Sequence, residues 1–253
     1  MNDARPAAIR RPGPAAHGQP AFVVRPYRPE DAPAIRRLCA DTAFFGRPID
    51  GVFIDREAYA DLSVQPYLRE QPDLAFVAEV QGRIVGYLLG AARPDFGRRR
   101  AFWGARVALR MLGRYLRGDY RCSPDRGRFV RWLVMRSLRE RPRRPKGCVA
   151  HLHFNLAVEA RGRGMAHALW RRFEAALRAR GVAEYYGEFL SYPGREPERV
   201  YRRYGLKEYA RRRCTVFGSA APQPLWLVCI HKRLSGEPVN AIRTGRHRTG
   251  IGA

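Results

Sequence analysis

The sequence predicts a single α/β domain in which helices flank a mixed central sheet. Three observations lead to this class. Apolar runs of strand length alternate with stretches of helical period along most of the 253 residues. A hydrophobic share of 45% suffices for one sizeable core. A basic segment at about residues 93–148 interrupts the alternation, so we expect an α-helical insertion there, between the third and fourth strands.

The part of the chain before the insertion predicts three strands and two helical regions. Residues 1–20 are rich in Pro, Ala and Arg without periodicity and are expected to be a disordered basic arm. FVVRPY, from Phe22, is typical of a strand, and Asp31 is a candidate N-cap for the helix after it. A second helical region is expected from Asp55 to about Arg69. LAFVAEV and IVGYLLGAA, separated by QGR, predict a β-hairpin.

The insertion is strongly basic. Between residues 93 and 146 it carries 18 Arg and Lys against 4 Asp and Glu, a net +14 out of the chain's formal +25. A basic amphipathic helix is predicted by apolar residues that recur at every fourth position, namely Trp103, Val107, Met111 and Tyr115, with Leu112 and Leu116 nearby. RFVRWLVMRSLRE (128–140) predicts a second such helix, which the proline-rich RPRRPKG ends.

The part after the insertion predicts four strands and two helices. The strands are expected at VAHLHFNLAV (149–158), AEYYGEFLS (183–191), KEYARRRCTVF (207–217) and PLWLVCIHKRL (224–234). A long amphipathic helix between the first two of them buries Ala166, Leu169, Trp170, Phe173 and Leu177, and EPERVYRRYG predicts a short helix. The domain is therefore expected to span residues 21–236, with a flexible basic tail at 237–253.

Composition places the chain in a reducing compartment. No apolar run reaches the length of a membrane span, and the N-terminal residues lack the apolar core of a signal peptide. The five cysteines are scattered, odd in number and without C-x-x-C spacing, which disfavours a disulfide framework. We therefore expect a cytoplasmic protein.

A glycine turn joins the strand at 149–158 to the long helix. Its residues, Arg161-Gly162-Arg163-Gly164-Met165-Ala166, place free backbone N–H groups at a helix N-terminus, where the partial positive charge favours phosphate. A dinucleotide-binding G-x-G-x-x-G turn is excluded because His167 stands at its third glycine, and a Walker A loop would need Lys and Ser or Thr. A plain strand-to-helix turn remains the alternative to a binding loop.

Two phrases together resemble the GCN5-related N-acetyltransferases (GNAT). Arg161-x-x-Gly164-x-Ala166 is similar to that family's acyl-CoA loop, [QR]-x-x-G-x-[GA], and Val200-Tyr201-Arg-Arg-Tyr-Gly205-Leu206 to its L-Y-x-x-x-G-F phrase. The order of elements from about Phe22 to Arg233 is also the family's, apart from the insertion. A few stand-alone bacterial members resemble the chain in having a comparable basic helical insertion followed by an HLH-x-N-L phrase. The resemblance implies the GNAT fold, acetyl-CoA as co-substrate, no metal, and direct acetyl transfer to a primary amine in a ternary complex.

The resemblance also implies roles for particular residues. The pyrophosphate of acetyl-CoA would bind the backbone N–H groups of Arg161, Gly162, Arg163, Gly164, Met165 and Ala166. The pantetheine arm would pair with the preceding strand at Leu156, Ala157 and Val158. Tyr201 would act as general acid on the CoA thiolate. Gly194 stands where the family often has a CoA-binding Asn, and a core face made of Val200, Tyr201 and Tyr204 is the alternative to catalysis.

The general base is less clearly marked. His151 and His153 alternate onto one strand face with Asn155, and a neutral imidazole there could take a proton from the amine. Counted without gaps from the loop, however, the family's base position falls on Ala150 and Leu152. Either histidine could therefore be catalytic, both could form a buried polar pair, or water could serve instead. Zinc bound by Cys148 and the two histidines is disfavoured because Cys148 has the opposite parity and no fourth ligand is evident.

The insertion and the acceptor leave several alternatives open. The insertion could cover the acceptor pocket and select an acidic small molecule or peptide, contact nucleic acid or membrane, or pack on the domain or on a second subunit of a homodimer. An acetyltransferase-like binding module without turnover is the alternative to an enzyme.

Overall fold

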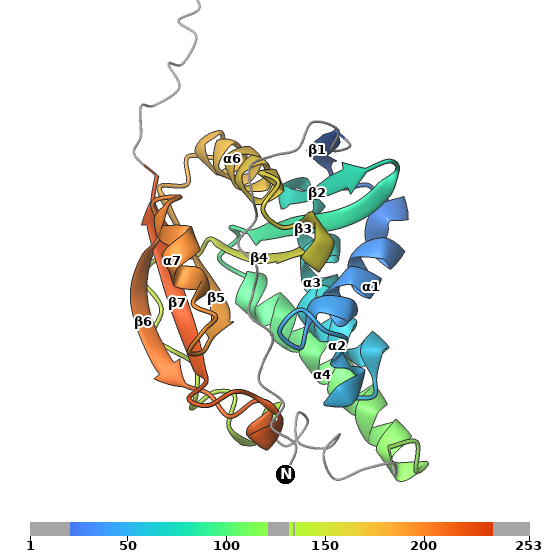
Figure 1. The fold of residues 1–253 in the computed structure, drawn as a ribbon. Helices are drawn as coiled ribbons and strands as arrows, with labels where there is room; N and C mark the ends of the chain where they lie inside the picture. Colours follow the sequence, from blue (N-terminus) through green and yellow to red (C-terminus); the bar gives the residue numbers. More distant parts are fainter. Residues whose placement is uncertain (1–20, 121–131, 134, 235–253) are drawn as a thin grey trace, which may run out of the picture.

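A computed structural model describes residues 21–120, 132–133 and 135–234 of the chain (Figure 1). The predicted arm and tail therefore lie outside the described residues, and so do residues 128–131 and 134 of the second predicted insertion helix. One seven-stranded sheet runs in the order β1-β2-β3-β4-β5-β7-β6. Its strands are β1 Phe22–Pro26, β2 Ala75–Val80, β3 Arg83–Ala91, β4 His151–Leu156, β5 Glu184–Ser191, β6 Lys207–Arg213 and β7 Trp226–Arg233. The helices are α1 Ala32–Thr42, α2 Arg56–Ser63, α3 Gln65–Glu70, α4 Phe96–Leu116, α6 Met165–Arg178 and α7 Pro197–Arg202.

Helices cover both faces of the sheet. On one face α6 packs on β2 and β3, and Phe173 fits so closely over Gly90 that a Cβ there would lie 2.3 Å from the ring. On the other face α1 packs on β3 and β4. Figure 1 shows α6 on one side of the strands and α1 to α4 on the other. The predicted mixed sheet with flanking helices is confirmed.

The sheet opens between β4 and β5. These strands run parallel but pair at only two positions, His151 with Tyr186 and Leu152 with Gly187. The other strand pairs of the described sheet are antiparallel, and β5 continues alongside β7 for its full length. Beyond Leu152, therefore, one edge of β4 faces an opening rather than a strand.

Local signals account for the elements, with one difference from the prediction. The hairpin turns at Gln81 and Gly82, whose positive φ angles of 49° and 75° suit a two-residue turn. Asp31 does precede α1, but its carboxylate accepts the Arg28 N–H at 2.8 Å instead of capping the helix. The helical region predicted from Asp55 to about Arg69 consists of two helices, because the chain breaks at Val64 and restarts with Pro66 in the first turn.

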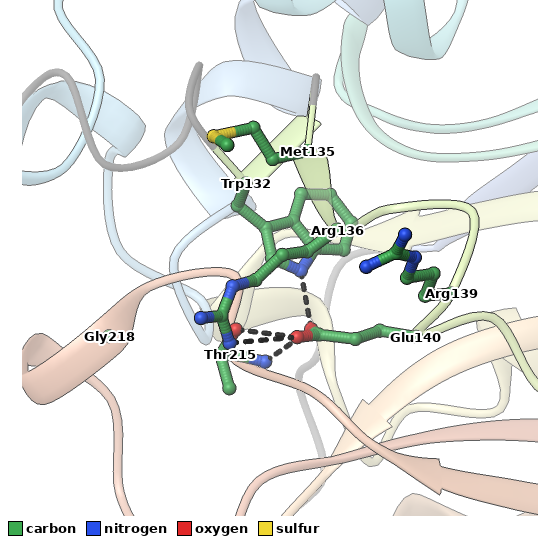
Figure 2. A pocket seen from close by; sticks show the side chains of 7 residues that line it. All are labelled: Trp132, Met135, Arg136, Arg139, Glu140, Thr215 and Gly218. Carbon is green, nitrogen blue, oxygen red and sulfur yellow. Dashed lines mark hydrogen bonds and ion pairs between the residues drawn. The ribbon is translucent and has the colours of Figure 1, made fainter.

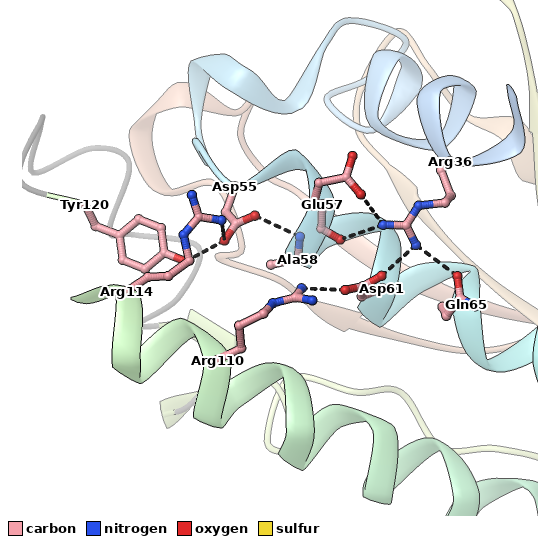
Figure 3. A network of polar contacts seen from close by, with 9 residues as sticks. All are labelled: Arg36, Asp55, Glu57, Ala58, Asp61, Gln65, Arg110, Arg114 and Tyr120. Carbon is pink, nitrogen blue, oxygen red and sulfur yellow. Dashed lines mark hydrogen bonds and ion pairs between the residues drawn. The ribbon is translucent and has the colours of Figure 1, made fainter. Parts of the chain in front are cut away.

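The insertion helix α4 packs on the domain. It buries Phe96, Val107 and Met111 and lies along α2 and α3. Figure 3 shows Arg110 reaching Asp61 and Arg114 reaching Asp55, at 3.0 Å for the latter pair. The Asp55 carboxylate, which is almost fully buried, also caps α2 by accepting the Ala58 N–H at 2.9 Å. In the part of the chain that the structure describes, no helix is both long and apolar enough to cross a membrane.

Candidate active site

The opening between β4 and β5 is a cavity of about 250 Å³. Its lining comes from helices and strands that are far apart in the sequence, and includes His153 and Asn155 of β4, Trp170 of α6, Glu188 of β5 and Tyr201 of α7. The predicted general acid and one of the two predicted histidines therefore line the same space.

The glycine turn lies at the end of β4, as the sequence predicts. After one 3-10 turn at Val158–Ala160 the chain passes through Gly162 and Gly164, with φ angles of +78° and +80°. These left-handed angles favour glycine. Gly164 is the N-cap of α6 and offers no side-chain hydrogen bond to the first turn. The N–H groups of that turn therefore have no side-chain cap, and uncapped N–H groups at a helix N-terminus can bind an anion.

The Arg161 side chain turns back along the end of β4. Its Nη2 donates to the Leu156 carbonyl at 3.4 Å, and a Cβ on Gly46 would lie 3.1 Å from it. Burial, and after it the nearby Arg195, lower the pKa of Arg161. Two guanidinium groups thus place positive charge beside Tyr201, whose pKa both of them lower.

The predicted pantetheine segment borders this opening. Leu156 ends β4 and is buried. The Ala157 N–H donates to the carbonyl of Val85, a residue of β3, at 2.8 Å. Val158 is 53% exposed. Ala157 and Val158 line an adjoining pocket of about 490 Å³, and Thr42 of α1 borders both this pocket and the cavity. The unpaired edge of β4 thus runs from the cavity to the glycine turn.

Tyr201 is held by two aromatic rings. Its ring centroid lies 4.9 Å from Phe189 and 5.3 Å from Trp170. Its hydroxyl makes no hydrogen bond within the described part of the chain. Burial raises the pKa of Tyr201 to about 12, so the phenol keeps its proton at neutral pH. Val200 is 49% exposed, so Val200, Tyr201 and Tyr204 do not form one buried face.

The two histidines have different surroundings. β3 and β4 pair without a register shift, so His151, His153 and Asn155 do share one face. His151, however, lies outside the cavity, stacked on Tyr186 at 5.3 Å and edge-on to Phe96 at 5.1 Å. His153 borders the cavity, and its buried Nδ1 has no hydrogen-bond partner among the described residues. Burial lowers the pKa of each histidine to about 4, so both are neutral at pH 7.

Three site residues, Arg144, Glu188 and Arg195, are not among the residues predicted from the sequence. Arg144, near the end of the insertion, forms a two-point ion pair with Glu188 at 2.8 and 3.2 Å and lies over the Tyr186 ring at 5.2 Å. Arg195 enters from the segment before α7. The parity of Glu188 with Tyr186 along β5 is the one sequence signal that places a carboxylate on this face. The insertion thus reaches the cavity wall through Arg144.

Another pocket, of about 820 Å³, is lined by residues at the end of the insertion and is separate from the cavity. Figure 2 shows Glu140 between Trp132 and Thr215 at its base. The Glu140 carboxylate accepts the Trp132 Nε1–H at 2.6 Å and the Thr215 N–H and hydroxyl at 2.7 Å each. Both of its oxygens are therefore engaged in fastening the insertion to the loop after β6, so this carboxylate is structural.

The structure places Cys148 near Glu184 and His231 and not with the two other histidines. The ligand atoms of these three residues lie within 4.8 Å of one another. His231 Nε2 is 3.0 Å from a Glu184 oxygen, and Arg233 Nε is 3.4 Å from the same oxygen. Thiolate, carboxylate and imidazole groups can bind zinc. Here, however, the Arg233 guanidinium already supplies a positive charge to Glu184. We therefore interpret Glu184 and His231 as a polar contact between the paired strands β5 and β7 and not as a metal site.

Comparison with solved structures agrees with this geometry. The chain is 31% identical to SsHAT, with 85% of this chain and 98% of that one covered and a TM-score of 0.59. The chain belongs to the GCN5-related N-acetyltransferase family. The GNAT fold is thereby shown. In the structure, α4 lies between β3 and β4, where the sequence predicts the insertion.

Two further solved structures match the chain at lower identity. The ribosomal-protein-S18-alanine N-acetyltransferase of Escherichia coli is 13% identical, covering 87% of this chain and 99% of its own, with a TM-score of 0.49. YncA of Salmonella typhimurium, a putative acetyltransferase determined with its cofactor acetyl-CoA, is 12% identical over the same shares with the same TM-score. No family model matches the chain, and no curated protein matches it in sequence.

Proposed function

We propose that this GNAT protein transfers an acetyl group from acetyl-CoA to a primary amine by direct attack within a ternary complex. The observation that carries the proposal is the cavity between β4 and β5. Tyr201 and His153 line it together, and the unpaired edge of β4 leads from it to the glycine turn. If the pantetheine arm of acetyl-CoA followed that edge, its thioester would lie beside Tyr201 and His153.

Acetyl-CoA binding uses backbone groups. The N–H groups of Arg161 to Ala166 would hold the pyrophosphate, because Gly164 leaves the first turn of α6 without a side-chain cap. The guanidinium groups of Arg161 and Arg195 add positive charge nearby. The pantetheine amides would pair with β4 near Leu156, Ala157 and Val158, where no strand of the described sheet competes.

The chemical step needs one acid and one acceptor of a proton. The amine nitrogen attacks the thioester carbonyl, and the carbon–sulfur bond breaks as the tetrahedral intermediate collapses. Tyr201, protonated at neutral pH, donates its proton to the departing thiolate. His153, neutral because of its lowered pKa, accepts a hydrogen bond from the attacking amine and passes its proton to water. His151, in its aromatic stack outside the cavity, has a packing role.

Positive charge on the insertion favours an acceptor that carries an acidic group. Arg141 and Arg100 form no hydrogen bond or ion pair within the described ranges, and Arg100 lies near enough to His153 to lower its pKa. Among the residues that the structure describes, the carboxylate that acts on Arg141 is Glu188, which is paired with Arg144. Two unpaired guanidinium groups would stabilise a carboxylate or phosphate on a small molecule or peptide.

The decisive experiment is a turnover screen. CoA release from acetyl-CoA is measured across acidic, neutral and basic amines, peptides and aminoglycosides, with Tyr201→Phe as the control variant. We expect release with an amine acceptor and its loss in the variant. Calorimetric binding of acetyl-CoA without turnover on any acceptor would favour a binding module, and no binding at millimolar ligand would reject the proposal.

A further inference from the structure

Helix α4 carries apolar residues on two opposite faces. One face, with Phe96, Val107 and Met111, is buried against the domain. The opposite face is an outer stripe, by which we mean Phe102, Ala105, Leu109, Leu112 and Leu116. These positions are separated alternately by three and four residues, so they form one continuous row along the helix.

The outer stripe is open to solvent. Phe102 is 62% exposed, Leu109 70%, Leu112 52% and Leu116 74%. A helix that is apolar on both sides is normally covered on both. Contiguous exposed apolar side chains of this size mark a binding surface, whereas single ones do not.

Unpaired arginines border the stripe. α4 contains six arginines and no acidic residue. Arg99, Arg110 and Arg114 are paired with carboxylates of the domain. Arg98, one turn before Phe102 in the same row, and Arg106, whose guanidinium lies 5.9 Å from the Phe102 ring centroid, form no ion pair within the described ranges. The occupant of the stripe must therefore offer both apolar volume and negative charge.

Charge and chemistry separate the candidate occupants. A second copy of the chain would bring two such arginine rows, each on a protein of formal charge +25, into contact. Nucleic acid would pair with Arg98 and Arg106 but gives no burial to three leucines. A bilayer with anionic headgroups provides both, and helices with Phe and Leu on one face and Arg beside them lie in its interface.

We infer that the outer stripe docks this protein on an anionic lipid surface, with α4 lying parallel to the membrane plane. Phe102, Leu109, Leu112 and Leu116 enter the acyl boundary, and Arg98 and Arg106 contact phosphate groups. α4 begins below β4 and runs past α2 to the lower end of the domain (Figure 1), and the side chains of the stripe are exposed on its outer side. The surface is separate from the cavity, so docking does not depend on the acetyltransferase proposal.

The test is sedimentation of the full-length protein with vesicles. We expect binding to phosphatidylcholine vesicles that contain phosphatidylglycerol and little binding to phosphatidylcholine alone. The double variant Leu109→Glu/Leu112→Glu should lower the bound fraction by about tenfold or more. Val23→Glu is the matched control, because Val23 is 58% exposed on β1 and should bind as the original protein does. Circular dichroism establishes that each variant is folded.

Other outcomes would overturn the inference. Absence of binding to anionic vesicles does so directly, and so does unchanged binding of the folded double variant, which would mean that charge alone attracts the protein. A dimer in solution that the double variant dissociates would assign the stripe to a second copy. A duplex DNA complex that the double variant loses, without vesicle binding, would assign it to nucleic acid.

Discussion

Gly164 and Gly181 provide a matched pair for testing the glycine turn. Both adjoin α6, Gly164 at its N-terminus and Gly181 just beyond its C-terminus, with φ angles of +80° and +70°. A Cβ at either position would meet nothing within 4 Å in the described part of the chain. Alanine therefore costs each site only the left-handed backbone penalty, about 1–2 kcal/mol. For a chain of this size that lowers the midpoint of thermal unfolding by about 2–8 °C.

Acetyl-CoA binding should separate the two variants. Gly164→Ala re-aims the first N–H groups of α6 or places a methyl group against the pyrophosphate, so one or two charge-assisted hydrogen bonds are lost. At about 1.5–3 kcal/mol in total, affinity falls by about 10–100-fold. Gly181→Ala should bind as the original protein does. Calorimetry alongside thermal unfolding measures both effects, and equal affinity of the two variants would refute the assignment of the turn.

Three further predictions follow from the described contacts. Tyr201→Phe should lower kcat by about 100-fold and leave the acetyl-CoA KM and the unfolding midpoint unchanged, because both ring contacts remain; an unchanged kcat would remove Tyr201 as the acid. His151 and His153 have pKa values near 4 in the folded protein, against an ordinary 6.5. As the pH drops from about 6.5 toward 4, these histidines are protonated in the unfolded chain but not in the folded one, so the free energy of unfolding decreases. That loss is about 2 kcal/mol per histidine by pH 5, and His153→Gln should reduce the difference between urea unfolding at pH 7 and pH 5. Asp55→Ala removes the α2 cap and the buried partner of Arg114, about 2–4 kcal/mol by urea unfolding, whereas Asp55→Asn keeps the cap and should cost less.

Much of the fold follows from local patterns. The hairpin from Ala75 to Ala91 is predictable because two apolar runs flank a glycine-containing turn, and α6 because its apolar positions have a helical period. The break at Val64 has a local cause too, since Pro66 cannot continue the hydrogen bonding of α2. For α4 the pattern indicates one buried face, but only the packing shows that a second apolar face is left open.

The site is less predictable because it forms where two strands separate. Parity alone puts His151 and His153 on the same face of β4. The pairing of β4 with β5 ends at Leu152, so His151 lies beside a paired strand and His153 beside the opening. Where two parallel strands diverge depends on tertiary packing, which no local pattern in β4 or β5 records. The Arg144–Glu188 pair likewise joins segments 44 positions apart.

The central claim is that the cavity between β4 and β5 receives the thioester of acetyl-CoA. A crystal structure of the full-length protein with acetyl-CoA tests it directly. The account predicts the pyrophosphate on the N–H groups of Arg161 to Ala166, the pantetheine along the free edge of β4, and the thioester sulfur within hydrogen-bonding reach of the Tyr201 hydroxyl. Acetyl-CoA bound with its thioester away from Tyr201 and His153 would contradict it.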